Sequence, residues 1–177
     1  MDLNINPIKE LLILIGGPIF QFIGLFLLLN LFPEKNEVIY FYHFSILFFN
    51  LLPVYPLDGG RILNIFIQIF KPYKKSIKLS IMISYLLLIV ILLLSSLKLN
   101  ILIMIIFLSS LIYKENKKID YIYNKFILER YLNNYKFRDS KIINSINNLY
   151  RGKKHLIKDN NIYYYEKDYL DKKLKKY

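Results

Sequence analysis

Long apolar segments with few charges limit what this sequence can fold into. They cover residues 11–32, 38–70, 79–97 and 99–113. A helix of about 20 residues crosses the roughly 30 Å apolar core of a bilayer, and backbone groups without hydrogen bonds are costly in lipid. The sequence therefore predicts an all-α, multi-pass integral membrane protein, with a membrane domain over residues 1–113.

The segment 38–70 is unusual because "PVYPLDGGR" interrupts it. As one helix it would extend about 50 Å at about 1.5 Å per residue, which is long for a single crossing. Prolines and glycines interrupt a helix, and a charge at mid-bilayer costs about 2.5 to 3.5 kcal/mol. Irregular backbone at this depth is tolerated where it lines an enclosed or aqueous site. We therefore expect one helix, broken at residues 53–60, that lines a functional site.

The positive charge is concentrated after the apolar part of the chain. The formal net charge is +12, and residues 114–177 hold 17 Lys or Arg against 8 Asp or Glu. The loop 71–78 is also basic, whereas the loop 33–37 is slightly acidic. Because basic loops stay in the cytoplasm, we expect four crossings, both termini in the cytoplasm, and a basic cytoplasmic tail over residues 114–177. The lack of cysteine excludes disulfides and thiolate metal sites.

Two motifs carry a resemblance to a known family. The sequence "NLLPVYPLDG" matches the pattern N-x-x-P-x-x-P-L-D-G at Asn50, Pro53, Pro56 and Asp58. The earlier "GGPIFQ", residues 16–21, is similar to a G-P-x-x-N element with Gln21 in place of asparagine. In these motifs and their order, the chain resembles the site-2 protease family of intramembrane zinc metalloproteases, and within it the sporulation branch. Members of that branch cleave the pro-sequence of a sporulation sigma factor.

The resemblance implies zinc-dependent peptide hydrolysis within the bilayer and a membrane-associated protein substrate. Asp58 would be the carboxylate ligand of the zinc, beside two histidines and an activated water. We expect roles for five further residues: substrate-strand binding for Asn50, Pro53 and Pro56, and a hinge for Gly59 and Gly60.

The histidine part of the family's catalytic set is missing from these 177 residues. The family takes two ligands and a general base from H-E-x-x-H, whereas this sequence has only His43 and His155, and neither belongs to such a motif. No catalytic set is therefore complete in this chain. We expect the C-terminal half of a protease, inactive alone: either its start codon is assigned internally, or a frameshift or gene split has left H-E-x-x-H on a separate upstream reading frame.

Other interpretations remain open at this point. The chain could be a non-catalytic pseudoprotease that binds a membrane partner through the same groove, or a transporter fragment with a broken helix. Asp58 and Arg61 could form an ion pair at a buried turn, and His43 could be a packed imidazole. Gly17 and Pro18 could serve helix packing alone.

The tail has a pattern of its own. Residues 149–174 predict strand, turn, strand and helix, similar to part of a nucleotide-sensing CBS module. Only about half of such a module fits, so we expect a partial CBS-like remnant or a short regulatory tail. Its lysines favour contact with anionic lipid, and no motif for nucleic acid is present.

Overall fold

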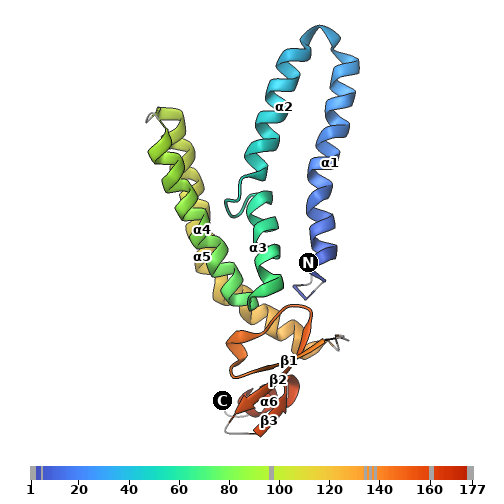
Figure 1. The fold of residues 1–177 in the computed structure, drawn as a ribbon, viewed down its shortest axis with the longest axis vertical. Coiled ribbons are helices and arrows are strands. Elements are labelled where there is room, and N and C mark those ends of the chain that lie inside the picture. Colours follow the sequence, from blue (N-terminus) through green and yellow to red (C-terminus); the bar gives the residue numbers. More distant parts are fainter. Residues whose placement is uncertain are drawn as a thin grey trace.

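The computed structural model describes residues 3–4, 6–95, 98–133, 135, 137, 139–159 and 162–174, and it is mostly helical. Five long helices come first: α1 (Pro7–Leu31), α2 (Asn36–Leu51), α3 (Asp58–Phe70), α4 (Tyr73–Leu94) and α5 (Leu99–Leu132). They form two hairpins, α1 with α2 and α4 with α5, and the two hairpins diverge away from the tail, with α3 beside α4 near their base (Figure 1).

The start of α1 follows from local sequence. The side chain of Asn6 accepts a hydrogen bond from the Ile8 N–H (3.0 Å), and Pro7 occupies the first helical position. An asparagine cap followed by proline is a common helix start, because it satisfies a free N–H and fixes the backbone for the first turn. The connection to α2 is the short 3₁₀ helix Pro33–Lys35.

The segment 38–70 does not form one helix. Its first part belongs to α2, which ends at Leu51, and its last part is α3, which begins at Asp58. Residues 52–57 join the two helices as a non-helical loop. The prolines explain this loop, because proline donates no backbone hydrogen bond and crowds the preceding turn. That α2 and α3 cross the membrane as one unit stays a prediction.

Three helices in the described part of the chain are long and apolar enough to cross a membrane: α1, α4 and α5. Two of them extend beyond the expected segments. The helix α4 begins at Tyr73, six positions before residue 79, and α5 runs on from residue 113 to Leu132. With 34 residues, α5 is about 51 Å long at about 1.5 Å per residue, so its charged end projects beyond an apolar core of about 30 Å.

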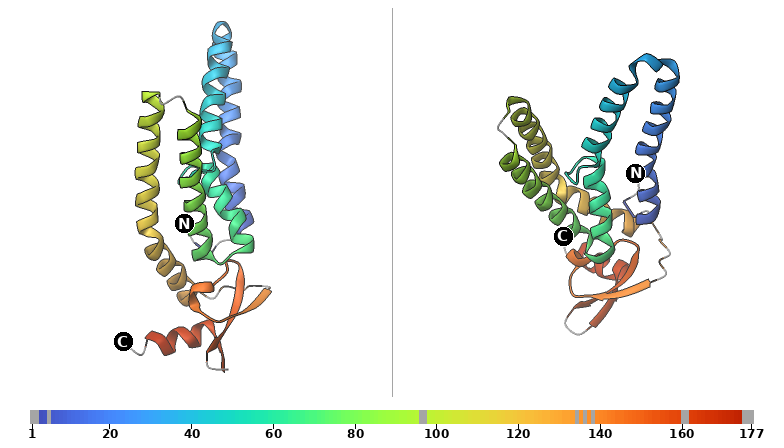
Figure 2. Two further views of the ribbon diagram at one scale, coloured as in Figure 1. Left: turned by 60° about the vertical axis from the view of Figure 1, so that its left-hand side comes forward. Right: turned by 45° about the horizontal axis from the view of Figure 1, so that its top comes forward.

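The tail adds a small sheet and one helix at the end of the molecule opposite the α1–α2 turn (Figure 2). The elements are β1 (Asp139–Ile143), the 3₁₀ helix η2 (Ile146–Asn148), β2 (Lys153–Asp159), β3 (Ile162–Tyr165) and α6 (Glu166–Leu174). The strand β2 pairs parallel with β1 and antiparallel with β3. The order of β2, turn, β3 and α6 is the order that the sequence predicts, whereas β1 was not expected.

The tail is packed against the membrane helices. The Tyr73 N–H donates to the Leu149 carbonyl (2.9 Å), and the Tyr73 ring stacks on Phe126 at 4.3 Å. The Arg151 guanidinium donates to Glu10 of α1 and to Gln68 of α3 (3.0 Å for Gln68). One buried side chain of the tail therefore joins the ends of α1 and α3.

Candidate functional site

The candidate site is built around the loop 52–57 and the first turn of α3. Asn50 lies in the last turn of α2, Pro53 and Pro56 lie in the loop, and the Tyr55–Pro56 bond is cis. Asp58 is half-buried and is the first residue of α3. A carboxylate is favoured there because the N-terminal end of a helix carries partial positive charge.

Gly59 and Gly60 allow the loop to lie directly against α3. A Cβ at Gly59 would come within 2.1 Å of the Leu51 carbonyl oxygen, and one at Gly60 within 2.5 Å of the Tyr55 nitrogen. Real Cβ atoms do not approach backbone this closely, so the local fold requires both glycines. This close approach explains the pair of glycines, and the hinge that the sequence suggested for them stays a prediction.

The second motif lies beside the first. A Cβ at Gly17 would be 3.7 Å from Asp58 Oδ2, so the carboxylate faces bare backbone on α1. One turn further along α1, Gln21 Nε2 donates to the His43 carbonyl (3.0 Å) and joins α1 to α2. The fold therefore brings together two motifs that the sequence separates by about 40 residues.

Ser84 on α4 holds the loop from the other side, and it belongs to a row of buried serines. Ser76, Ser80 and Ser84 recur at every fourth position and are fully buried, at 0% exposure. Ser84 Oγ accepts from the Tyr55 N–H (2.8 Å) and donates to the Ser80 carbonyl (2.8 Å). Ser80 Oγ donates to the Gly60 carbonyl (3.3 Å). Neither sequence motif includes these serines, although their regular spacing within an apolar segment was an available signal.

The alternatives for single residues can be compared with their surroundings. His43 is buried, its ring lies 5.4 Å from that of Phe22, and its Nε2 has no hydrogen-bond partner among the described residues. It is therefore a packed imidazole in this structure. Asp58 and Arg61 form no ion pair within the described ranges, and Arg61 is exposed.

The residues present do not make a zinc site. In the described part of the chain, no three His, Cys, Asp or Glu side chains gather closely enough to hold a metal ion. Asp58 supplies one carboxylate, whereas a catalytic zinc takes three protein ligands and a water. The donor set in these 177 residues is thus incomplete for the metal that the family uses.

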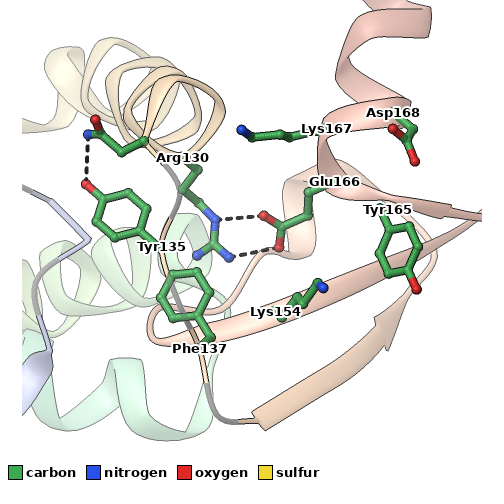
Figure 3. Close-up of a pocket in the computed structure, with 9 residues that line it drawn as sticks. Arg130, Tyr135, Phe137, Lys154, Tyr165, Glu166, Lys167 and Asp168 are labelled. Atoms are coloured by element: carbon green, nitrogen blue, oxygen red, sulfur yellow. Dashed lines mark hydrogen bonds and ion pairs between the residues drawn. The ribbon is translucent and has the colours of Figure 1, made fainter.

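A pocket of about 560 Å³ lies in the tail between the end of α5 and the start of α6 (Figure 3). Arg130, which lines the pocket, forms a bidentate ion pair with Glu166. Its Nε donates to Oε2 (3.0 Å) and its Nη2 to Oε1 (2.8 Å). The same guanidinium donates to the Tyr150 and Lys153 carbonyls and lies 4.5 Å from the Phe137 ring. Arg130 therefore uses its guanidinium for hydrogen bonds within the fold. That the tail is a partial CBS-like module stays a prediction.

His155 completes this buried cluster and is fully enclosed, at 0% exposure. The Tyr150 N–H donates to its Nε2 (3.0 Å), so in the neutral ring Nδ1 carries the proton and donates to Glu166. Burial lowers the pKa of His155 and outweighs the opposing effect of Glu166. Burial by itself would raise the pKa of Glu166, but contacts with His155 and Arg130 lower it. The pair is therefore a neutral histidine beside an ionised carboxylate.

Comparison with known proteins identifies the family. A family model described as "Peptidase family M50" matches residues 34–94, which include the loop and Asp58. The chain is also 33% identical over 138 residues to "Stage IV sporulation protein FB" of Bacillus subtilis (strain 168), which covers 71% of this chain and 48% of that protein. It thus spans about half the length of that relative. With its three apolar helices, the chain is an integral membrane protein that belongs to peptidase family M50, the site-2 protease family.

Proposed function

We propose that this chain forms the carboxylate-bearing, substrate-binding part of an intramembrane metallopeptidase that cleaves membrane-associated proteins. The position of Asp58 carries the proposal. Asp58 begins α3 and faces Gly17 of the second family motif. It directly follows the loop 52–57, which lies within the match to the family model. Asp58 supplies one metal ligand, and the histidine pair and the general base come from outside the 177 residues, on the same polypeptide or on a partner.

The loop would bind an extended substrate segment through its carbonyl oxygens. The N–H groups of Val54, Tyr55 and Leu57 already donate to Leu52, Ser84 and Val54, and the two prolines have none. The Pro53 and Tyr55 carbonyls accept no hydrogen bond from the described residues. The N–H groups of an unwound substrate segment therefore donate hydrogen bonds to these two carbonyl oxygens.

The relative supports a role in sporulation, since its printed name is "Stage IV sporulation protein FB". We propose that the substrate is a membrane-associated protein of that programme, with sigma-factor processing as the reaction. The 177 residues by themselves are inactive and hold no stoichiometric zinc at micromolar concentration, because one carboxylate is a weak site for this ion. One tightly held zinc per purified chain, lost in Asp58→Ala, would contradict this.

The function is tested by co-expressing the chain with a membrane segment that bears the family's H-E-x-x-H and with a tagged single-span substrate. We expect cleavage only when both pieces are present, and its loss in Asp58→Asn. Glu37→Gln is the matched control, because this exposed carboxylate lies in the first turn of α2, away from the loop. Co-purification of substrate without cleavage by the intact pair would favour the pseudoprotease.

We also propose that both termini face the cytoplasm. The sequence has no cysteine, so single cysteines can be placed at the exposed positions Lys75, Lys141 and Asn36. An impermeant thiol reagent should label Lys75→Cys and Lys141→Cys from the cytoplasmic side and Asn36→Cys from the other. Labelling of Lys141→Cys from outside would mean that α5 does not cross.

A further inference from the structure

A basic groove lies where the α3–α4 turn meets the tail. It has a volume of about 360 Å³ and is lined by Lys71 from the turn, Lys75 from the start of α4 and Lys141 from β1. Asn144 and Asn148 add two amide side chains. Lys71 and Lys141 are 70 positions apart in the sequence, so the tertiary fold alone brings these cations together.

The walls of the groove are fixed by the core. Ile143 at the end of β1 and Leu149 before β2 are buried, at 5% and 2% exposure, in the same cluster as Tyr73. The Tyr73 N–H donates to the Leu149 carbonyl across the junction. The lysines are therefore mounted on two elements that are packed together.

The charge of the groove is not neutralised by the protein. Among the described residues, no carboxylate lines the groove, and Lys71, Lys75 and Lys141 take part in no ion pair. The neighbouring Lys74 differs, because its Nζ lies 2.7 Å from Asp120. Lys141 Nζ is held 3.8 Å from the centre of the Tyr150 ring, a cation–π contact. Three unneutralised cations around one groove attract an anion.

The position of the groove indicates which anion. Lys71 follows the last residue of α3, and Lys75 lies in the first turn of α4, a helix apolar enough to cross a membrane. This is the level of lipid headgroups if α4 crosses. Phe70 directly precedes Lys71 in the chain, and its exposed ring meets the exposed ring of Phe66 edge-on at 5.6 Å, which offers an apolar surface to an acyl chain.

We propose that this groove binds the phosphate headgroup of an anionic membrane glycerolipid, with Lys71, Lys75 and Lys141 around the phosphate. Basic pockets at the cytoplasmic ends of membrane helices suit such headgroups. A soluble phosphate would match the charges but would leave Phe66 and Phe70 exposed. The proposal does not depend on the peptidase function, since it uses none of the residues assigned to that site.

Native mass spectrometry of the whole chain tests the site, with release from micelles that contain phosphatidylglycerol and phosphatidylcholine in equal amounts. We expect one phosphatidylglycerol retained per chain in preference to phosphatidylcholine. Replacing Lys71, Lys75 and Lys141 singly by Gln should weaken retention about fivefold each, from about 1 kcal/mol per lysine near a membrane surface. The triple variant should weaken it about 100-fold.

A charge-matched control separates the groove from the net charge. Lys117, Lys158 and Lys172 are exposed lysines outside the groove, each above a tyrosine ring. Their triple replacement by Gln removes the same charge and should leave lipid retention unchanged. Equal losses of lipid retention in the two triple variants, or no preference for phosphatidylglycerol, would overturn the site. Displacement of the lipid by millimolar inorganic phosphate would show that a free anion is the occupant and would overturn the lipid assignment.

Discussion

The hydroxyl of Ser84 is predicted to hold the loop 52–57 in place, and its removal should loosen that loop alone. In Ser84→Ala the Tyr55 N–H loses the one acceptor that the described residues offer it, 2.8 Å away in the native chain. An unsatisfied, largely buried N–H costs about 1 to 3 kcal/mol. The Ser80 carbonyl still accepts a helical hydrogen bond from the residue 84 N–H, so the second contact of the hydroxyl adds little. If the loop loses about 2 kcal/mol of local stability, the equilibrium constant for its opening increases about 30-fold.

Hydrogen exchange of the chain in lipid nanodiscs measures this opening, because the rate of exchange reports the free energy of local unfolding. Peptides that contain residues 52–57 should exchange faster in Ser84→Ala. Ser76→Ala is the matched control: this serine is equally buried, but its hydroxyl donates only to the Tyr73 carbonyl in its own helix. Equal acceleration in both variants, or none in Ser84→Ala, would refute a role for the Ser84 hydroxyl in holding the loop.

Three further predictions follow from contacts described above. Gly59→Ala should destabilise the chain by about 3 kcal/mol in detergent unfolding, since its Cβ meets backbone, whereas Gly24→Ala, with no atom within 4 Å, should not. Arg151→Ala should cost about 2 kcal/mol in the same assay, less than a fully buried pair because the Glu10 side chain is 23% exposed. Stability should fall as the pH drops below about 6.5, because the unfolded chain takes up a proton that folded His155 binds more weakly. In His155→Gln, denaturant unfolding between pH 7 and 5 should show a flatter profile.

Sequence patterns predicted those parts of the fold that depend on local chemistry. Apolar segments located the membrane helices, and the prolines located the interruption before Asp58. The patterns placed the start of α4 and the end of α5 too far inside the helices, because charged residues at helical spacing continue a helix without continuing an apolar segment. The strand β1 escaped notice since four of its five residues are exposed, so no alternation is visible.

The site was predicted only as far as its motifs. The motifs pointed to Asp58 and the loop, whose roles stay predictions, and nothing in the sequence indicated that Gly17 lies against the carboxylate or that Ser84 holds Tyr55 across 29 positions. Such contacts depend on how helices pack, and the apolar faces of membrane helices leave many packings open. The missing histidines were visible at once, because the absence of a motif needs no tertiary information.

The contact between Arg151 and Glu10 has a consequence for how the protein is made. The two residues are 141 positions apart, and at about 5 to 20 residues per second a ribosome needs roughly 7 to 30 s to pass from one to the other. During this interval α1 and α3 are already synthesised, and the side chain that joins their ends does not yet exist. The contact that joins the ends of α1 and α3 therefore forms only after both motifs have been made, and a nascent chain halted before residue 151 would hold both motifs without it.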